Sequence, residues 1–294
     1  MSELSDMIRK MFKEGDDIRD AGLTTPEDIK RFDDIVYGSD ENWQVLDVYR
    51  PKNAEGKLPV IISVHGGGWV YGDKERYQFY CMSLAQRGFA VVNFTYRLAP
   101  EFKFPSSLED TNLVAEFVMK NAEEYGFDTE NIFAVGDSAG AHLLGLYSGF
   151  LTNKEYANKY EFKAPEGFSL KAVALNCGVS RITSDDKESQ DFQLMKELLP
   201  GGATDEEIEN ISVVNFITHD YPATFVMTAD GDFLKDKQLP LVAKLMECNV
   251  PNVFRYYYVP GDQPLGHVFH CNMKLDEAAR CNDEECNFFK SFIR

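Results

Sequence analysis

The sequence predicts an α/β protein with a mostly parallel central sheet of about eight strands, covered by helices on both faces. Short β-branched apolar runs recur along the chain, and stretches long enough for a helix separate them. These runs are apolar at consecutive positions, which is typical of strands buried on both faces. With 294 residues, 44% of them hydrophobic, the chain can form one large domain spanning 1–294.

The first elements precede this alternation. One apolar stripe at helical spacing predicts an N-terminal helix. Its residues are Leu4, Met7, Ile8, Met11 and Phe12. Two strand-like runs, 31–38 and 43–51, follow with the turn-rich SDEN between them. They predict an antiparallel hairpin at the edge of the sheet.

The alternating part begins near residue 59. The expected strands are 59–66, 89–96, 131–137, 171–178, 223–230 and 253–261. The expected helices are 75–87, 106–124, 139–151, 236–248 and 274–292. Residues 180–220 interrupt the pattern, because this interval exceeds an ordinary connection and contains helical segments of its own. We expect a small helical cap made of residues 1–25 and about 180–220, with a solvated insertion as the alternative.

The composition excludes several classes of partner. The net charge of −18 leaves no basic stripe for nucleic acid and disfavours an anionic membrane surface. The N-terminus is charged throughout, which predicts a cytoplasmic protein without a signal peptide or spanning helix. Six scattered cysteines predict reduced, buried thiols. The run HVFHC lacks a second cluster with ligand spacing, so we expect no metal.

Ser138 is the candidate nucleophile. It lies between Gly136 and Gly140, directly after an expected strand and before an expected helix. Small residues there allow a sharp turn that exposes the hydroxyl at the carboxyl edge of the sheet, where open α/β sheets bind ligands. A serine hydroxyl needs a base to remove its proton.

The base should follow an acid in the chain, because this architecture orders its catalytic groups as serine, acid, histidine. Of five histidines, only His267 and His270 come after a plausible acid. His267 follows Gly266 in the loop after the last strand, from which a ring can reach Ser138, whereas His270 is expected to begin the next helix. We therefore choose His267.

Three aspartates compete for the role of the acid. Asp230 ends an expected strand, and Asp236 resembles a helix cap. Asp232 lies on the turn between them, where it can orient the imidazole and stabilise its charged form. Asp232 is preferred, and Asp230 stays as the alternative.

The glycine run in SVHGGGWVYG follows an expected strand. Glycines allow neighbouring backbone N–H groups to point together at a developing negative charge. Gly67, Gly68 and Ala139 are the expected oxyanion-hole donors. Trp69 and Tyr71 are expected to shape an apolar substrate pocket.

These motifs together resemble the hormone-sensitive-lipase-like family of α/β-hydrolases, which holds many microbial carboxylesterases and acetyl esterases. The resemblance extends from about residue 40 to 290, in order and spacing. It rests on HGGGW, YRLAPEFKFPSSLED, GDSAG, DFLKD and GHVF. Phe233 stands where the family commonly has proline.

The resemblance implies the α/β-hydrolase fold and hydrolysis of carboxylic esters without metal or organic cofactor. It assigns the catalytic triad to Ser138, Asp232 and His267, and the hole to the three donors already chosen. It also matches His65 and Glu101, which we expect to brace the glycine loop.

The predicted function is a serine carboxylesterase acting on small short-acyl esters, acetyl to butyryl, including acetylated sugars or oligosaccharides. An amidase or formamidase with the same triad is an alternative, since a group that protonates the leaving nitrogen suffices. A binding protein that has lost catalysis is a third, and the intact triad argues against it. The expected partner is a small-molecule ester. Assembly into a homo-oligomer is compatible with the sequence.

Overall fold

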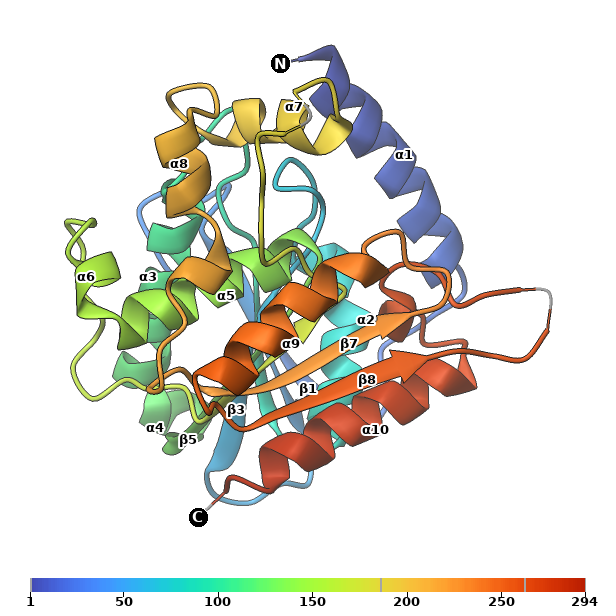
Figure 1. Ribbon diagram of the computed structural model, residues 1–294. Coiled ribbons are helices and arrows are strands. Elements are labelled where there is room, and N and C mark those ends of the chain that lie inside the picture. Colours follow the sequence, from blue (N-terminus) through green and yellow to red (C-terminus); the bar gives the residue numbers. More distant parts are fainter. Residues whose placement is uncertain (1, 186, 262, 294) are drawn as a thin grey trace.

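A mixed sheet runs through the middle of the molecule, with helices on both of its faces (Figure 1). The computed structural model describes residues 2–185, 187–261 and 263–293. Within them the sheet has eight strands in the order β1-β2-β4-β3-β5-β6-β7-β8. The predicted fold class, an α/β-hydrolase fold, is confirmed.

The strands lie close to the positions that the sequence predicts. They are β1 (Ile29–Val36), β2 (Val45–Pro51), β3 (Leu58–Val64), β4 (Ala90–Phe94), β5 (Phe127–Asp137), β6 (Ala172–Asn176), β7 (Ala223–Ala229) and β8 (Asn252–Tyr257). β1 and β2 form the expected antiparallel hairpin at one edge, and β2 pairs antiparallel with β4. From β4 to β8 every neighbouring pair is parallel.

Helices connect the strands and extend beyond them. The α-helices are α1 (Glu3–Asp20), α2 (Lys74–Gln86), α3 (Ser106–Lys120), α4 (Ala122–Tyr125), α5 (Ala139–Thr152), α6 (Lys154–Ala157), α7 (Gln190–Leu198), α8 (Asp205–Asn210), α9 (Gln238–Glu247) and α10 (Asp276–Lys290). The 3₁₀ helices are η1 (Val213–Asn215), η2 (Lys235–Lys237) and η3 (Phe269–Cys271). His270, expected to begin the next helix, lies within η3, the short helix that follows the loop, and α10 begins six residues later at Asp276. No helix of the described residues has the length and apolar character that crossing a bilayer requires.

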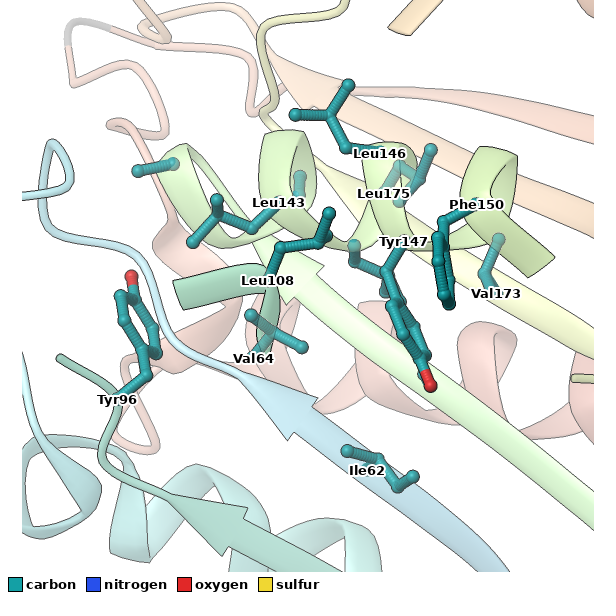
Figure 2. Close-up of a cluster of buried hydrophobic side chains, with 14 of the residues drawn as sticks. Ile62, Val64, Tyr96, Leu108, Leu143, Leu146, Tyr147, Phe150, Val173 and Leu175 are labelled. Carbon is teal, nitrogen blue, oxygen red and sulfur yellow. The ribbon is translucent and has the colours of Figure 1, made fainter. Parts of the chain in front are cut away.

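Both faces of the sheet are buried. Successive side chains of β3 belong to opposite cores, since Ile62 packs in one hydrophobic cluster and Ile61 in the other. The first cluster lies between the strands and α5 (Figure 2). Its members in that view include Ile62, Val64, Leu143, Leu146, Phe150, Val173 and Leu175. Fully burying a side chain of this kind contributes roughly 1.5–3 kcal/mol, so α5 is held firmly against the sheet.

Parallel pairing brings the ends of several strands to one edge of the sheet. Val64 at the end of β3 pairs with Gly136 near the end of β5, so the glycine run and the turn at Ser138 are neighbours. The loops after β7 and β8 end at the same edge, where Gly231 and Gly266 form a bridge. The sheet therefore positions all the loops that carry the predicted site.

Two further segments lie over this edge. α1 contacts α7, and the two helices lie side by side at the top of Figure 1. Residues 180–220 contain α7, α8 and η1, so their helical character is as expected. α1 buries Ile8, while Met7 and Met11 stay about half exposed.

Candidate active site

The backbone at Ser138 makes a sharp turn between β5 and α5. Its φ of 53° and ψ of −119° lie in a region that residues with a Cβ rarely adopt. A Cβ at Gly136 would lie 2.6 Å from the carbonyl oxygen of Gly140, and a Cβ at Gly140 would collide with the carbonyl of Val64. The Ser138 N–H donates to the carbonyl of Asn176 on β6 at 2.9 Å. Both glycines are required by close backbone approach, and the turn is fixed on two sides.

Three predicted side chains meet at this turn. His267 Nε2 lies 2.9 Å from Ser138 Oγ, and His267 Nδ1 lies 2.7 Å from Asp232 Oδ1. The three residues follow β5, β7 and β8, and they are 129 and 35 positions apart in sequence. This chain of hydrogen bonds can carry a proton from the serine hydroxyl to the imidazole, with the carboxylate fixing the ring.

Asp232 is buried, and both of its carboxylate oxygens accept hydrogen bonds. Its Oδ1 accepts from the Leu234 N–H at 2.9 Å, and its Oδ2 accepts from the Thr228 hydroxyl at 2.6 Å. Burial alone would raise the pKa of Asp232, but the contact with His267 and these two hydrogen bonds outweigh it, and the pKa lies below its usual value. The carboxylate is therefore ionised at neutral pH.

Asp230, the alternative acid, has a different place. Its Oδ1 accepts from the Leu265 N–H at 2.8 Å and from the Gly231 N–H at 3.1 Å. Asp230 thus ties the loop after β7 to the loop that carries His267. The structure brings Asp232, and not Asp230, to the imidazole.

The glycine loop turns its backbone through the left-handed region. Gly67 has φ 120°, Gly68 has φ 59° and Trp69 has φ 64°. Among the hydrogen bonds of the described residues, none uses the N–H of Gly67, Gly68 or Ala139. All three expected donors are therefore free to bind a ligand oxygen.

Of the two residues expected to brace this loop, His65 contacts it directly and Glu101 acts through Arg9. His65 is buried, its Nδ1 lies 2.7 Å from the carbonyl oxygen of Gly66, and burial lowers its pKa to about 4. Glu101 binds the guanidinium of Arg9 with both oxygens, at 2.8 and 2.6 Å. Arg9 also donates to the carbonyls of Val70 at 2.7 Å and Ala99 at 3.0 Å. Sequence reasoning missed Arg9, because nothing local to α1 indicates these contacts.

His142, one turn after Ser138, was also missed. Its Nδ1 accepts from the Trp69 indole N–H at 3.1 Å, and its Nε2 donates to the carbonyl of Ile211 at 2.7 Å. Burial lowers the pKa of His142 to about 4, so the ring is neutral at pH 7 and makes both contacts. His142 thereby links the glycine loop to the 180–220 segment.

A cavity of about 270 Å³ opens above Ser138 and His267. It is lined by Met11, Phe12, Gly15, Asp16 and Arg19 of α1, by Gly66, Gly67, Tyr71, Tyr77, Asp137 and Val268, and by Phe233. Tyr71, expected to shape the substrate pocket, lines this cavity. Trp69 lines a separate cavity of about 220 Å³ instead, beside the 180–220 segment.

Two clusters of the described residues have the composition of a metal site. The ligand atoms of Asp137, His270 and Cys271 lie within 4.8 Å of one another, as do those of Cys177, Asp232 and His267. Burial raises the pKa of both thiols well above its usual value, so neither is a thiolate at neutral pH. In the second cluster, Asp232 and His267 are already hydrogen-bonded to each other at 2.7 Å.

Comparison with known proteins gives a family and a fold. The family model described as BD-FAE matches residues 46–241. The chain is 27% identical over 240 residues to a versiconal hemiacetal acetate esterase of Dothistroma septosporum, covering 76% of this chain and 70% of that protein. It is 34% identical over 143 residues to esterase LipC of Mycobacterium tuberculosis, where the match spans 48% of this chain but only 34% of the relative.

Solved structures resemble the whole chain. Esterase B from Lactobacillus rhamnosis, bound to a tributyrin phosphonate inhibitor, superposes with a TM-score of 0.89 at 23% identity, covering 99% of this chain and 96% of that one. A bacterial heroin esterase superposes with a TM-score of 0.78 at 20% identity, covering 99% and 92%. At these identities the likeness establishes the fold.

Proposed function

The chain belongs to the BD-FAE family of α/β-hydrolases and is a carboxylic ester hydrolase, and on that premise we propose that it cleaves small short-acyl esters, acetyl to butyryl, through an acyl-enzyme on Ser138. The observation that carries the proposal is the hydrogen-bonded chain from Ser138 through His267 to Asp232, at 2.9 and 2.7 Å, beneath a small cavity.

Acylation begins when Ser138 Oγ attacks the ester carbonyl carbon and gives its proton to His267 Nε2. The carbonyl π electrons move to the oxygen, which becomes an oxyanion. Asp232 stabilises the imidazolium that forms and keeps Nε2 turned toward the serine. The carbon–oxygen bond to the alcohol then breaks, and His267 gives its proton to the departing alkoxide.

The free N–H groups of Gly67, Gly68 and Ala139 support the same reaction. An oxyanion in the cavity would accept from them, and each such donor typically lowers the barrier by about 3–4 kcal/mol. Ala139 is the first residue of α5, whose N-terminus also favours negative charge.

Deacylation repeats the steps with water. His267 removes a proton from water while the water oxygen attacks the acyl carbon. When the second tetrahedral intermediate collapses, the bond to Ser138 Oγ breaks and His267 returns the proton to that oxygen. The carboxylic acid leaves, and the enzyme is restored.

The cavity supports small, uncharged substrates. Its polar groups already have partners, since Asp16 lies 2.8 Å from Arg19 Nη1 and accepts from the Tyr71 hydroxyl at 2.9 Å, and Asp137 accepts from the Tyr77 hydroxyl at 2.7 Å. A charged substrate would gain no free partner there and would lose its hydration. A volume of about 270 Å³ suits a short acyl group together with a small alcohol, including an acetylated sugar.

The two segments over the site fit the role of a cap. α1 supplies one wall of the cavity, and the 180–220 segment contacts it through α7. We propose that the chain is a single α/β-hydrolase domain in which these two segments form that cap.

The test is kcat/KM on a ladder of 4-nitrophenyl esters from acetyl to long acyl, beside the matched acetanilide. The proposal expects a steep preference for acetyl to butyryl and far slower cleavage of the anilide. Equal or faster cleavage of the anilide would favour the amidase alternative, and a preference for long acyl groups would overturn the short-acyl proposal.

A further inference from the structure

Phe233 is an exposed aromatic residue in contact with the catalytic histidine. Its side chain is 71% exposed, and its ring centroid lies 4.3 Å from that of His267, with an angle of 43° between the planes. A single exposed apolar residue is ordinary on a protein surface. Phe233 differs from that case because its ring also lines the cavity above Ser138.

The backbone fixes the direction of this ring. Asp232 and Leu234, on either side of Phe233, are both buried, and the Asp232 carboxylate accepts from the Leu234 N–H at 2.9 Å. With both neighbours turned inward, the side chain between them projects outward, beside the imidazole. The position of the ring therefore follows from the same hydrogen bonds that hold the catalytic acid.

The position of the Phe233 ring beside His267 indicates which part of an ester substrate the ring would contact. The imidazole must give its proton to the departing alcohol oxygen, so that oxygen has to come within hydrogen-bond reach of Nε2. The group attached to the alcohol oxygen consequently lies next to the imidazole, and the acyl group lies on the side of the oxyanion donors. A residue that contacts the imidazole and lines the cavity is placed to touch the alcohol part.

We propose that Phe233 is the leaving-group platform of this enzyme, on which the flat aromatic ring of an aryl or arylmethyl alcohol stacks while its ester is cleaved. The proposal rests on the function proposed above and adds the class of alcohol to it. Aromatic rings favour offset or tilted contacts with each other, and an exposed ring loses unfavourable hydration when a second ring covers it.

The rest of the cavity suits the same alcohol. Phe12 and Tyr71 line it as well, with ring centroids 5.9 Å apart at an interplanar angle of 75°. They come from α1 and from the glycine loop, whereas Phe233 comes from the loop after β7. With Tyr77 of α2, aromatic side chains from four separate elements thus line one cavity.

The experiment uses four esters and three variants of the full chain. Benzyl acetate and ethyl acetate differ in the alcohol, and ethyl butyrate differs from ethyl acetate only in the acyl group. The variants are Phe233→Ala, Phe233→Leu and, as a matched control, Tyr256→Ala, because Tyr256 is 52% exposed on β8 and does not line the cavity. The fourth ester, cyclohexylmethyl acetate, has a saturated ring of similar size in place of the flat one.

Phe233→Ala should lower kcat/KM for benzyl acetate by about fivefold to tenfold, and for ethyl acetate by less than about twofold, since only the former can stack. Phe233→Leu should lose most of the preference for benzyl over cyclohexylmethyl acetate. The ratio of ethyl butyrate to ethyl acetate should not change. Tyr256→Ala should match the wild type on every ester.

Other results would overturn the inference. An equal loss on benzyl and ethyl acetate, whether small or complete, would mean that Phe233 acts only on His267. A changed butyrate-to-acetate ratio would place Phe233 on the acyl side, and no loss on any ester would remove it from the site. If the wild type cleaves none of the four esters, the proposed function itself fails, which is a different outcome.

Discussion

The carboxyl edge of the sheet and the cap above it are built in different ways. At the sheet edge, Ser138, Asp232 and His267 are held by strand ends whose register is set by backbone pairing. Above it, α1 is attached through side chains such as Arg9, which reaches residues 61 to 92 positions away. The reacting groups are therefore positioned by backbone pairing in the sheet, whereas the shape of the substrate cavity depends on side-chain contacts of α1, both polar ones such as those of Arg9 and the apolar packing of Ile8.

The largest expected effect is at the sheet edge. Asp232→Asn should lower kcat by a factor on the order of 10⁴, because an amide cannot stabilise the imidazolium and favours the wrong ring tautomer. Asp230→Asn should cost less than about tenfold, since Asp230 only ties two loops together. Steady-state kinetics on one acetyl ester decides the matter, and a larger loss for Asp230→Asn would reverse the assignment of the acid.

The next effect concerns a buried acid behind the site. Glu285 on α10 accepts from Asn176 Nδ2 at 2.6 Å and from the Tyr80 hydroxyl at 3.0 Å, and burial raises its pKa from 4.5 to about 7. The folded state thus favours the neutral acid. The stabilisation is complete below pH 4.5 and is lost as the pH rises through about 7.

Glu285→Gln should remove this dependence, because an amide stays neutral. The variant should match the wild type near pH 4 and exceed its free energy of unfolding by up to about 3 kcal/mol at pH 8. Urea unfolding at both pH values measures the difference. A variant that is less stable than the wild type at pH 8 would show that the fold does not disfavour the ionised form of Glu285, so that its pKa is not raised.

A smaller effect is expected at the cap. Arg9→Met removes the contacts with Glu101, Val70 and Ala99, which should loosen both α1 and the glycine loop and lower kcat/KM by about tenfold. Lys13→Met is the matched control, since Lys13 lies on the same helix and pairs with Asp17 at the surface. Equal activity in both variants would contradict the idea that Arg9 holds the cap.

The smallest expected effect comes from backbone strain at Ser138. A left-handed φ costs free energy for any residue with a Cβ but not for glycine. Ser138→Gly should therefore be more stable than Ser138→Ala by about 1 kcal/mol, although neither can form an acyl-enzyme. Thermal or urea unfolding of the two variants compares them directly, and equal stability would mean that the turn stores no strain.

The sheet edge could be predicted from the sequence, whereas the contacts of the cap could not. The strands, the helices and the convergence of Ser138, Asp232 and His267 follow from local apolar runs and from the shared edge of parallel strands. The cavity does not follow, because Phe12 and Arg19 enter it only through the docking of α1. Trp69 shows the limit most clearly. Tyr71, two residues further along the chain, lines the cavity above Ser138. The Trp69 indole instead donates a hydrogen bond to His142, 73 residues away, and lines the separate cavity beside the 180–220 segment.

In the proposed reaction Ser138 becomes covalently bound to the acyl group. The most direct test treats the wild type and Ser138→Ala with a 4-nitrophenyl butylphosphonate ester, follows release of 4-nitrophenol, and locates the added mass by peptide mass spectrometry. We expect one phosphonyl group on Ser138 in the wild type, none in the variant, and a loss of ester hydrolysis in the variant on the order of 10⁴ or more. Label on another residue, or hydrolysis that survives in Ser138→Ala, would contradict it.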